Sequence, residues 1–124
     1  MRQEIKFSQS LEDYLEIIYL LKKEKGNVRV KDIALRLSIS LPSVTEMIRK
    51  LAKKRLVKYK RYGLVELTIA GEDIAKKVYT IHRLLTKFFL SIGVDEKTAL
   101  HDACLAEHVL SKKTLNKINE FVRK

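Results

Sequence analysis

The fold is most clearly indicated by residues 30–67, which read VKDIALRLSISLPSVTEMIRKLAKKRLVKYKRYGLVEL. Apolar residues at helical spacing predict a helix over Val30–Leu37, followed by a tight turn over residues 38–40. A second helix is predicted to begin near Pro42, because the fixed φ of proline suits a first helical turn, and to continue to about Arg55. Two short helices joined in this way are the outline of a helix-turn-helix.

The end of the same segment has the alternating pattern of a small hairpin. Leu56–Lys60 and Leu64–Leu67 are predicted to be strands, with Arg61–Gly63 as the turn between them. Gly63 can adopt the positive φ that such a turn requires. Because this hairpin follows the second helix directly, it is predicted to be the wing of a winged helix-turn-helix.

The flanking sequence is helical and contains few residues that break helices, since the chain has one proline and four glycines. Further helices are predicted over residues 11–25, 70–92, 96–110 and 112–122, with Ser10, Thr68, Asp95 and Ser111 as their N-caps. The fold is therefore predicted to be mostly α with a small β-hairpin. A winged helix-turn-helix over residues 1–72 precedes a helical domain over residues 73–124, which is too small to bury its apolar stripes alone.

Composition narrows the class of protein. The chain has 124 residues, of which 46% are hydrophobic, and a net charge of +11, which favours a polyanionic partner such as nucleic acid or an acidic membrane surface. A basic membrane-surface protein is disfavoured, because the amphipathic faces are needed for a core. A single cysteine, with neither a signal peptide nor a membrane-spanning segment, predicts a cytoplasmic protein.

One group of candidate functional residues follows from the basic segment over residues 49–61, which contains no acidic residue. Its side chains are predicted to contact phosphates of double-stranded DNA, while the first half of the second helix reads bases. The candidates are Ser40, Pro42, Ser43, Thr45, Glu46, Arg49, Lys50, Lys53, Lys54, Lys58, Lys60 and Arg61. Alternatively, Ser40 and Ser43 only cap the helix and Glu46 is solvated. Tyr59 and Tyr62 either pack on sugars or fill the core of the wing.

A second group has the residue types that bind metals. Cys104, Glu107 and His108 are spaced i, i+3 and i+4, so one helical face gathers a thiolate, a carboxylate and an imidazole. Asp13 and Glu16 share a face in the first helix, and His82 lies in the long central helix. Mixed oxygen, nitrogen and sulfur donors suit a first-row divalent ion. Singly, each residue also has an ordinary explanation, such as a capping acid, a solvated glutamate, a core histidine or a small buried thiol.

The order of several motifs resembles a known family. These are Leu11–Tyr19, Ser43–Thr45, Gly63–Val65, Leu67–Thr68, His82–Leu85 and Cys104–Ser111. Together they resemble the diphtheria toxin repressor and manganese transport regulator family of metal-dependent repressors, over nearly the entire chain. The resemblance implies a homodimer that binds a palindromic DNA operator and represses metal-uptake genes when metal is bound. It also implies that the ligands are Asp13, Glu16, His82, Cys104, Glu107 and His108.

The sequence mixes features of two branches of that family. The manganese branch typically has an acid where this chain has Cys104, and the iron branch typically has Met where it has Asp13. A thiolate favours iron, cobalt or zinc, and carboxylates favour manganese or iron. Iron(II) therefore ranks first and manganese(II) next, and cobalt(II) or zinc(II) can substitute. Thr86 replaces an acid of the iron branch's ancillary site, and His101, the other candidate for that site, is shifted by one residue, so a second site is expected to be weak or differently built.

The predicted mechanism is that metal fixes the winged helix against the dimerisation segment and thereby favours the DNA-competent state. The alternative is a metal-independent winged-helix regulator. An enzyme with Cys104 as nucleophile and His108 as base is disfavoured, because Cys104 lies within a helix whose backbone N–H groups are already used. No small-molecule substrate is expected.

Overall fold

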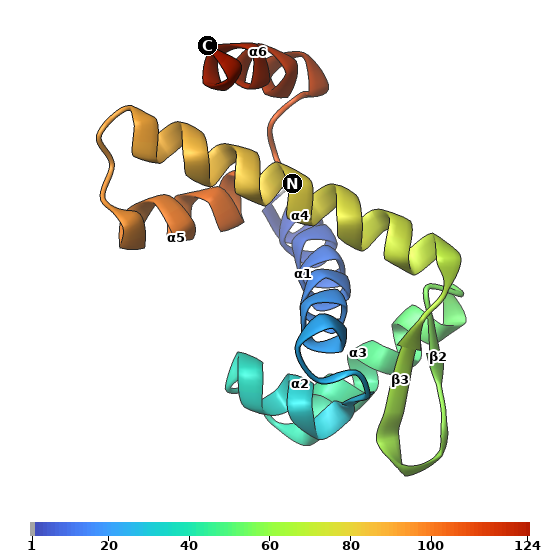
Figure 1. Ribbon diagram of the computed structural model, residues 1–124. Helices are drawn as coiled ribbons and strands as arrows, with labels where there is room; N and C mark the ends of the chain where they lie inside the picture. Colours follow the sequence, from blue (N-terminus) through green and yellow to red (C-terminus); the bar gives the residue numbers. More distant parts are fainter. Residues whose placement is uncertain (1) are drawn as a thin grey trace. The chain divides into compact units, whose positions relative to one another are not determined.

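The computed structural model describes the backbone of residues 2–124 and the side chains of residues 11–124. Its elements are α1 (Arg2–Lys25), β1 (Val28–Arg29), α2 (Val30–Leu37), α3 (Leu41–Lys53), β2 (Val57–Tyr59), the 3₁₀ turn η1 (Arg61–Gly63), β3 (Leu64–Leu67), α4 (Ile69–Ser91), α5 (Glu96–Ala106) and α6 (Lys112–Arg123) (Figure 1). The predicted class, mostly α with a small β-hairpin, is confirmed. No helix among the described residues is both long and apolar enough to cross a bilayer.

The chain divides into two compact units. Ser10–Lys76 forms the N-terminal unit, and Lys77–Lys124 forms the C-terminal unit together with the residues up to Gln9. The predicted domain boundary between residues 72 and 73 falls within α4 and stays a prediction.

The N-terminal unit contains the predicted helix-turn-helix. Ser38 takes a left-handed conformation with φ of 56°, which ends α2 and turns the chain into α3. Ser40 caps α3, since its hydroxyl accepts a hydrogen bond from the backbone N–H of Ser43 at 3.3 Å. Val44 and Ile48 of α3 are fully buried. The spacing of these apolar residues therefore fixes which face of α3 points into the core.

The wing is a three-stranded antiparallel sheet in the order β1-β3-β2. The predicted hairpin is present, with Val57 opposite Leu67, and its turn contains Gly63 at a φ of 73°. The strand β1 was not predicted. It contains only two residues, and it is defined by the pairing of Val28 with Val65 rather than by an alternating pattern of its own.

Two predicted helix ends are wrong. The helix α1 begins at Arg2 instead of Leu11, so Ser10 lies inside the helix, because no proline or glycine interrupts residues 2–10. The helix α5 ends at Ala106 instead of Leu110. Ser111 must leave the helical conformation to cap α6, so the chain turns over the preceding residues. That turn is tight, since the N–H of Val109 donates to the carbonyl of Ala106 at 3.1 Å.

The C-terminal unit contains most of α4 together with α5 and α6. The carboxylate of Asp95 caps α5 by accepting a hydrogen bond from the N–H of Thr98 at 3.0 Å, and this bond lowers the pKa of Asp95. The ring of Phe88 on α4 meets Phe121 on α6 edge to face, with ring centroids 5.6 Å apart. A contact between His82 and Glu107 joins α4 to the residue that follows α5. This contact positions the candidate metal ligands of the unit.

Candidate DNA-binding face and candidate metal ligands

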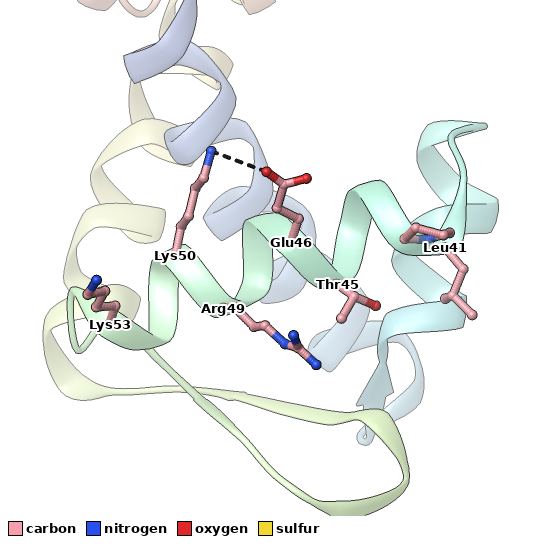
Figure 2. A pocket seen from close by; sticks show the side chains of 7 residues that line it. Leu41, Thr45, Glu46, Arg49, Lys50 and Lys53 are labelled. Atoms are coloured by element: carbon pink, nitrogen blue, oxygen red, sulfur yellow. Dashed lines mark ion pairs between the residues drawn. The ribbon is translucent and has the colours of Figure 1, made fainter.

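The outer side of α3 forms a shallow hollow of about 540 Å³. It is lined by Leu41, Pro42, Thr45, Glu46, Arg49, Lys50 and Lys53, all from this helix (Figure 2). These residues alternate with the buried stripe that contains Val44 and Ile48, so helical periodicity places them on the surface. The hollow contains six of the twelve predicted DNA-binding residues and one residue, Leu41, that the prediction omitted.

The polar side chains of this face divide between its two sides. In Figure 2, Thr45 and Arg49 point to one side of α3, while Glu46 and Lys50 point to the other. The Lys50 ammonium lies 3.8 Å from the Glu46 carboxylate, in the i,i+4 arrangement. Since both side chains are well exposed, this ion pair contributes little to stability.

The wing continues the basic surface. Lys54, Lys58, Lys60 and Arg61 are exposed, as predicted for cations that cannot be buried without partners. Lys60 donates to the Glu66 carboxylate at 3.0 Å, and this hydrogen bond holds the pKa of Glu66 below its usual value. These cations follow the recognition helix without interruption, which suits an extended polyanion.

The wing tyrosines do not fill the core of the wing. Tyr62 is 87% exposed at the turn, where it has a φ of 61°, and Tyr59 is 36% exposed. The buried positions belong to Val57 and Val65 instead. The structure therefore excludes the alternative in which Tyr59 and Tyr62 fill the core of the wing.

In the C-terminal unit, a buried carboxylate lies between two imidazoles. The side chain of Glu107 is fully buried, and its Oε2 lies 2.9 Å from Nδ1 of His82. Its Oε1 lies 3.3 Å from Nε2 of His108, a side chain that is only 2% exposed. Among the described residues, Oε1 accepts no hydrogen bond with acceptable geometry. Cys104, on the last turn of α5, precedes Glu107 by three residues.

This arrangement fits a bound cation. A buried carboxylate oxygen without a hydrogen bond is costly, and a divalent ion would compensate for it. Carboxylate, imidazole and thiolate are donors that a first-row transition metal accepts together. The structure thus places His82, Glu107 and His108 together in one unit.

The remaining predicted ligands lie on α1 in the N-terminal unit. Glu16 is 8% exposed, which is unusual for a carboxylate, and Asp13 is partly exposed one turn before it. Both side chains therefore stand on a single face of α1, as their spacing predicts. Assigning them and Cys104 to one metal stays a prediction.

The residues considered for a second metal site are engaged locally. The Thr86 hydroxyl donates to the backbone carbonyl of His82 at 2.8 Å. His101 is exposed on α5, with its Nδ1 3.4 Å from the carboxylate of Asp102. Neither arrangement supplies a buried set of donors.

Comparison with protein families accounts for nearly all of the chain. Residues 6–65 match the family described as iron dependent repressor, N-terminal DNA binding domain. Residues 68–124 match the family described as iron dependent repressor, metal binding and dimerisation domain. The first match contains the helix-turn-helix, and the second contains His82, Glu107 and His108.

Individual relatives of the chain support the match to a family of DNA-binding repressors. The chain is 41% identical over 114 residues to the HTH-type transcriptional regulator MntR of Geobacillus thermodenitrificans, which covers 92% of this chain and 81% of that protein. The MntR of Bacillus subtilis is also 41% identical, with 80% of it covered.

Among solved structures, the manganese regulator SloR superposes with a TM-score of 0.80 at 31% identity, covering 91% of this chain and 53% of that chain. A manganese-dependent transcriptional repressor in complex with manganese gives a TM-score of 0.82 at 30% identity, with 52% of it covered. The chain thus spans about half the length of these two solved neighbours.

Proposed function

The chain belongs to the iron-dependent repressor family, whose members are metal-dependent transcriptional repressors and not enzymes, and on this premise we propose how its residues bind metal and DNA. A divalent transition metal binds to donors of both units and favours the form of a homodimer that binds a palindromic operator. The proposed ligands are Asp13, Glu16, His82, Cys104, Glu107 and His108.

One observation carries this proposal. Glu107 is a fully buried carboxylate whose Oε1 has no hydrogen bond among the described residues, although Nε2 of His108 lies 3.3 Å away. Burial at such a cost is retained where the charge has a function. The match of residues 68–124 to a metal-binding domain supports metal binding as that function. It also disfavours the alternative of a metal-independent regulator.

The metal is proposed to be iron(II) or manganese(II). The matching family is described as iron dependent, while the solved neighbour SloR is described as a manganese regulator. Carboxylates suit both ions, and the Cys104 thiolate favours iron, cobalt or zinc. Iron(II) accepts the complete donor set, so we rank it first. A thiolate ligand also requires a reducing compartment, which favours the cytoplasm.

The control of DNA binding follows from the positions of these residues in sequence. Asp13 and Glu16 belong to the N-terminal unit, and the other four ligands belong to the C-terminal unit, which mediates dimerisation. Ligation by residues of both units would restrict their relative motion. In a dimer, this restriction sets the separation of the two recognition helices, which must match half-sites about one helical turn of DNA apart.

The DNA contacts are proposed to divide by position. Thr45, Glu46 and Arg49, with the residues at the start of α3, face the base edges, and the cations from Lys50 to Arg61 contact phosphates. The position of Thr45, Glu46 and Arg49 on the outer side of α3 and the exposure of the cations support this division.

The test is operator binding followed by fluorescence anisotropy under anaerobic conditions. A palindromic duplex is titrated with the protein in chelator, and then with iron(II), manganese(II), cobalt(II) or zinc(II) added. We expect the affinity to rise at least tenfold with iron(II) or manganese(II). The variant Cys104→Ala/His108→Ala should lose this response while keeping the weak binding measured in chelator.

A Lys112→Ala/Lys113→Ala variant is the control, because it changes exposed residues of α6 and leaves all proposed ligands intact. Equal binding with metal and with chelator would refute metal control. An unchanged metal response in the Cys104→Ala/His108→Ala variant would instead refute the ligand assignment.

A further inference from the structure

The first residue of the recognition helix is an exposed leucine. Leu41 is 47% exposed at the start of α3, although its spacing from Val44 and Ile48 is that of a buried stripe. Residues four apart are neighbours on a helix surface, so Leu41, Thr45 and Arg49 form one ridge. Leu41 therefore lies in line with the residues proposed to face DNA.

The surroundings of Leu41 are apolar. Pro42, the next residue, is exposed, and Thr45, which carries a methyl group, lies one turn further along α3. Both line the hollow, and Figure 2 shows Thr45 on the turn after Leu41. The nearby hydroxyls are engaged within the helix cap, since Ser40 donates to the Ser43 oxygen at 2.9 Å and accepts from its N–H. The cations of the hollow, Arg49, Lys50 and Lys53, belong to the second half of the helix. The exposed face of α3 is thus apolar at its start and cationic toward its end.

This polarity agrees with what each half of a recognition helix meets. The N-terminal residues enter the major groove, where base edges present donors and acceptors and one apolar group, the C5-methyl of thymine. Leucine has no hydrogen-bonding group, so against a polar base edge it would remove water without replacing its hydrogen bonds. Against a thymine methyl, both groups are apolar and the contact is favourable.

We propose that Leu41 is a specificity-determining residue that contacts the C5-methyl group of a thymine in the operator. This inference rests on the proposed function, because it requires that α3 enters the major groove. It makes the start of α3 selective for thymine by shape and apolarity, in addition to any hydrogen bonds made by Glu46 or Arg49.

Deoxyuridine provides a direct test, since it differs from thymidine only by the missing methyl group. The operator sequence is first obtained by selection from random duplexes with the manganese(II)-loaded full chain. Each thymine is then replaced singly by deoxyuridine, and binding is measured by anisotropy. At one thymine in each half-site, we expect the replacement to weaken binding of the unmodified protein about threefold to tenfold.

The variant Leu41→Ala should weaken binding to the thymine operator by a similar factor, and should bind the thymine and deoxyuridine duplexes equally. Leu35→Ala is the matched control, because Leu35 is 79% exposed on α2 and does not line the hollow. This control should retain the full sensitivity to deoxyuridine. Thermal unfolding followed by circular dichroism confirms that both variants fold.

The outcomes separate this inference from the proposed function. Metal-dependent selection of a sequence, with no thymine sensitive to deoxyuridine, overturns the role of Leu41 and leaves the repressor intact. The same holds if Leu41→Ala retains the sensitivity of the unmodified protein. Failure to bind any duplex with any metal would overturn the proposed function and this inference with it.

Discussion

The buried carboxylate of Glu107 carries a free-energy cost that a bound ligand could offset. Its carboxylate is buried, one oxygen lies 2.9 Å from His82, and the other lies 3.3 Å from His108 without a hydrogen bond. A negative charge in this position opposes folding unless a cation accompanies it. If the proposed metal binds here, it would offset this cost, and the protein is expected to be less stable without it.

Replacing Glu107 with Gln should separate these two effects. The amide keeps the size of the side chain and removes its charge, so we expect metal affinity to fall by at least about tenfold while metal-free stability is unchanged or higher. Competition with a fluorescent metal indicator measures the affinity, and urea unfolding measures the stability. Glu120→Gln, an exposed change on α6, is the control and should have neither effect. Equal metal affinity in Glu107→Gln would remove Glu107 from the ligand set.

The helix α2 depends on an acid at its N-terminus. Asp32 accepts a hydrogen bond from the backbone N–H of Arg29 at 2.8 Å, and it forms an ion pair with Lys25 at 2.6 Å. Burial raises the pKa of Asp32, but the hydrogen bonds from Lys25 and the Arg29 backbone outweigh this effect and hold the pKa below its usual value. These contacts hold α2 against the end of α1 and so help to position the helix-turn-helix.

A lowered pKa gives this contribution a definite dependence on pH. Stability from ionised Asp32 is fully present above the ordinary aspartate pKa and is lost as pH falls through the lowered folded value. Asp32→Asn should therefore be less stable than the unmodified protein at pH 7, by about 1 kcal/mol. The difference should vanish in strong acid. Urea unfolding across this pH range measures it, with the exposed Asp73→Asn as control. A difference that persists unchanged in acid would argue against the ionised cap.

The junction between the wing and α4 is closely packed. A Cβ atom built on Gly71 would lie 2.0 Å from the backbone carbonyl oxygen of Leu56. That oxygen also accepts the N–H of Thr68 at 3.1 Å, and the Thr68 hydroxyl accepts from the N–H of Gly71 at 3.1 Å. Only glycine allows the first turn of α4 to approach the base of the wing so closely.

Gly71→Ala should consequently destabilise the N-terminal unit by about 3 kcal/mol or more, because backbone must move to admit the methyl group. Gly26→Ala is the comparison, since Gly26 has a φ of 85° but no atom within 4 Å of its Cβ position. Its cost should be only about 1 kcal/mol, from conformation alone. Both values come from thermal or urea unfolding. Equal destabilisation by the two changes would mean that the junction relaxes easily.

Features that depend on local spacing were predictable from sequence, and features that depend on a distant partner were not. Val44 and Ile48 identify the buried face of α3 by their spacing alone, and Ser40 is a cap by its chemistry. The strand β1 exists only because Val28 meets Val65. Leu41 was missed for a related reason, because burial of a residue at the edge of a core depends on what lies beside it.

The residues of the candidate sites likewise divide into those that were predictable from sequence and those that were not. Cations of the basic segment were predictable, because charge keeps them on the surface. The contact of Glu107 with His108 agrees with their neighbouring positions in sequence, although α5 ends before Glu107, and the inclusion of Cys104 in the same site stays a prediction. That Glu107 is fully buried between two imidazoles could not be predicted, because its neighbour His82 comes from another helix.

The last prediction concerns where the positive charge acts on DNA. A net charge of +11 can attract DNA through the entire surface of the protein or through one face. Each cation that pairs with a phosphate releases counterions, so it contributes about one unit to the slope of log affinity against log salt concentration. In a dimer, Lys54→Gln should therefore lower this slope by roughly two units and weaken operator and unrelated DNA about equally.

Lys87→Gln removes the same charge from an exposed position of α4 in the C-terminal unit. If the basic segment from Arg49 to Arg61 is the DNA-binding surface, this variant should keep the original slope in anisotropy titrations at several salt concentrations. If both variants lower the slope equally, DNA responds to the total charge of the protein. The excess of cations would then be a property of the overall surface and not of the recognition helix and wing.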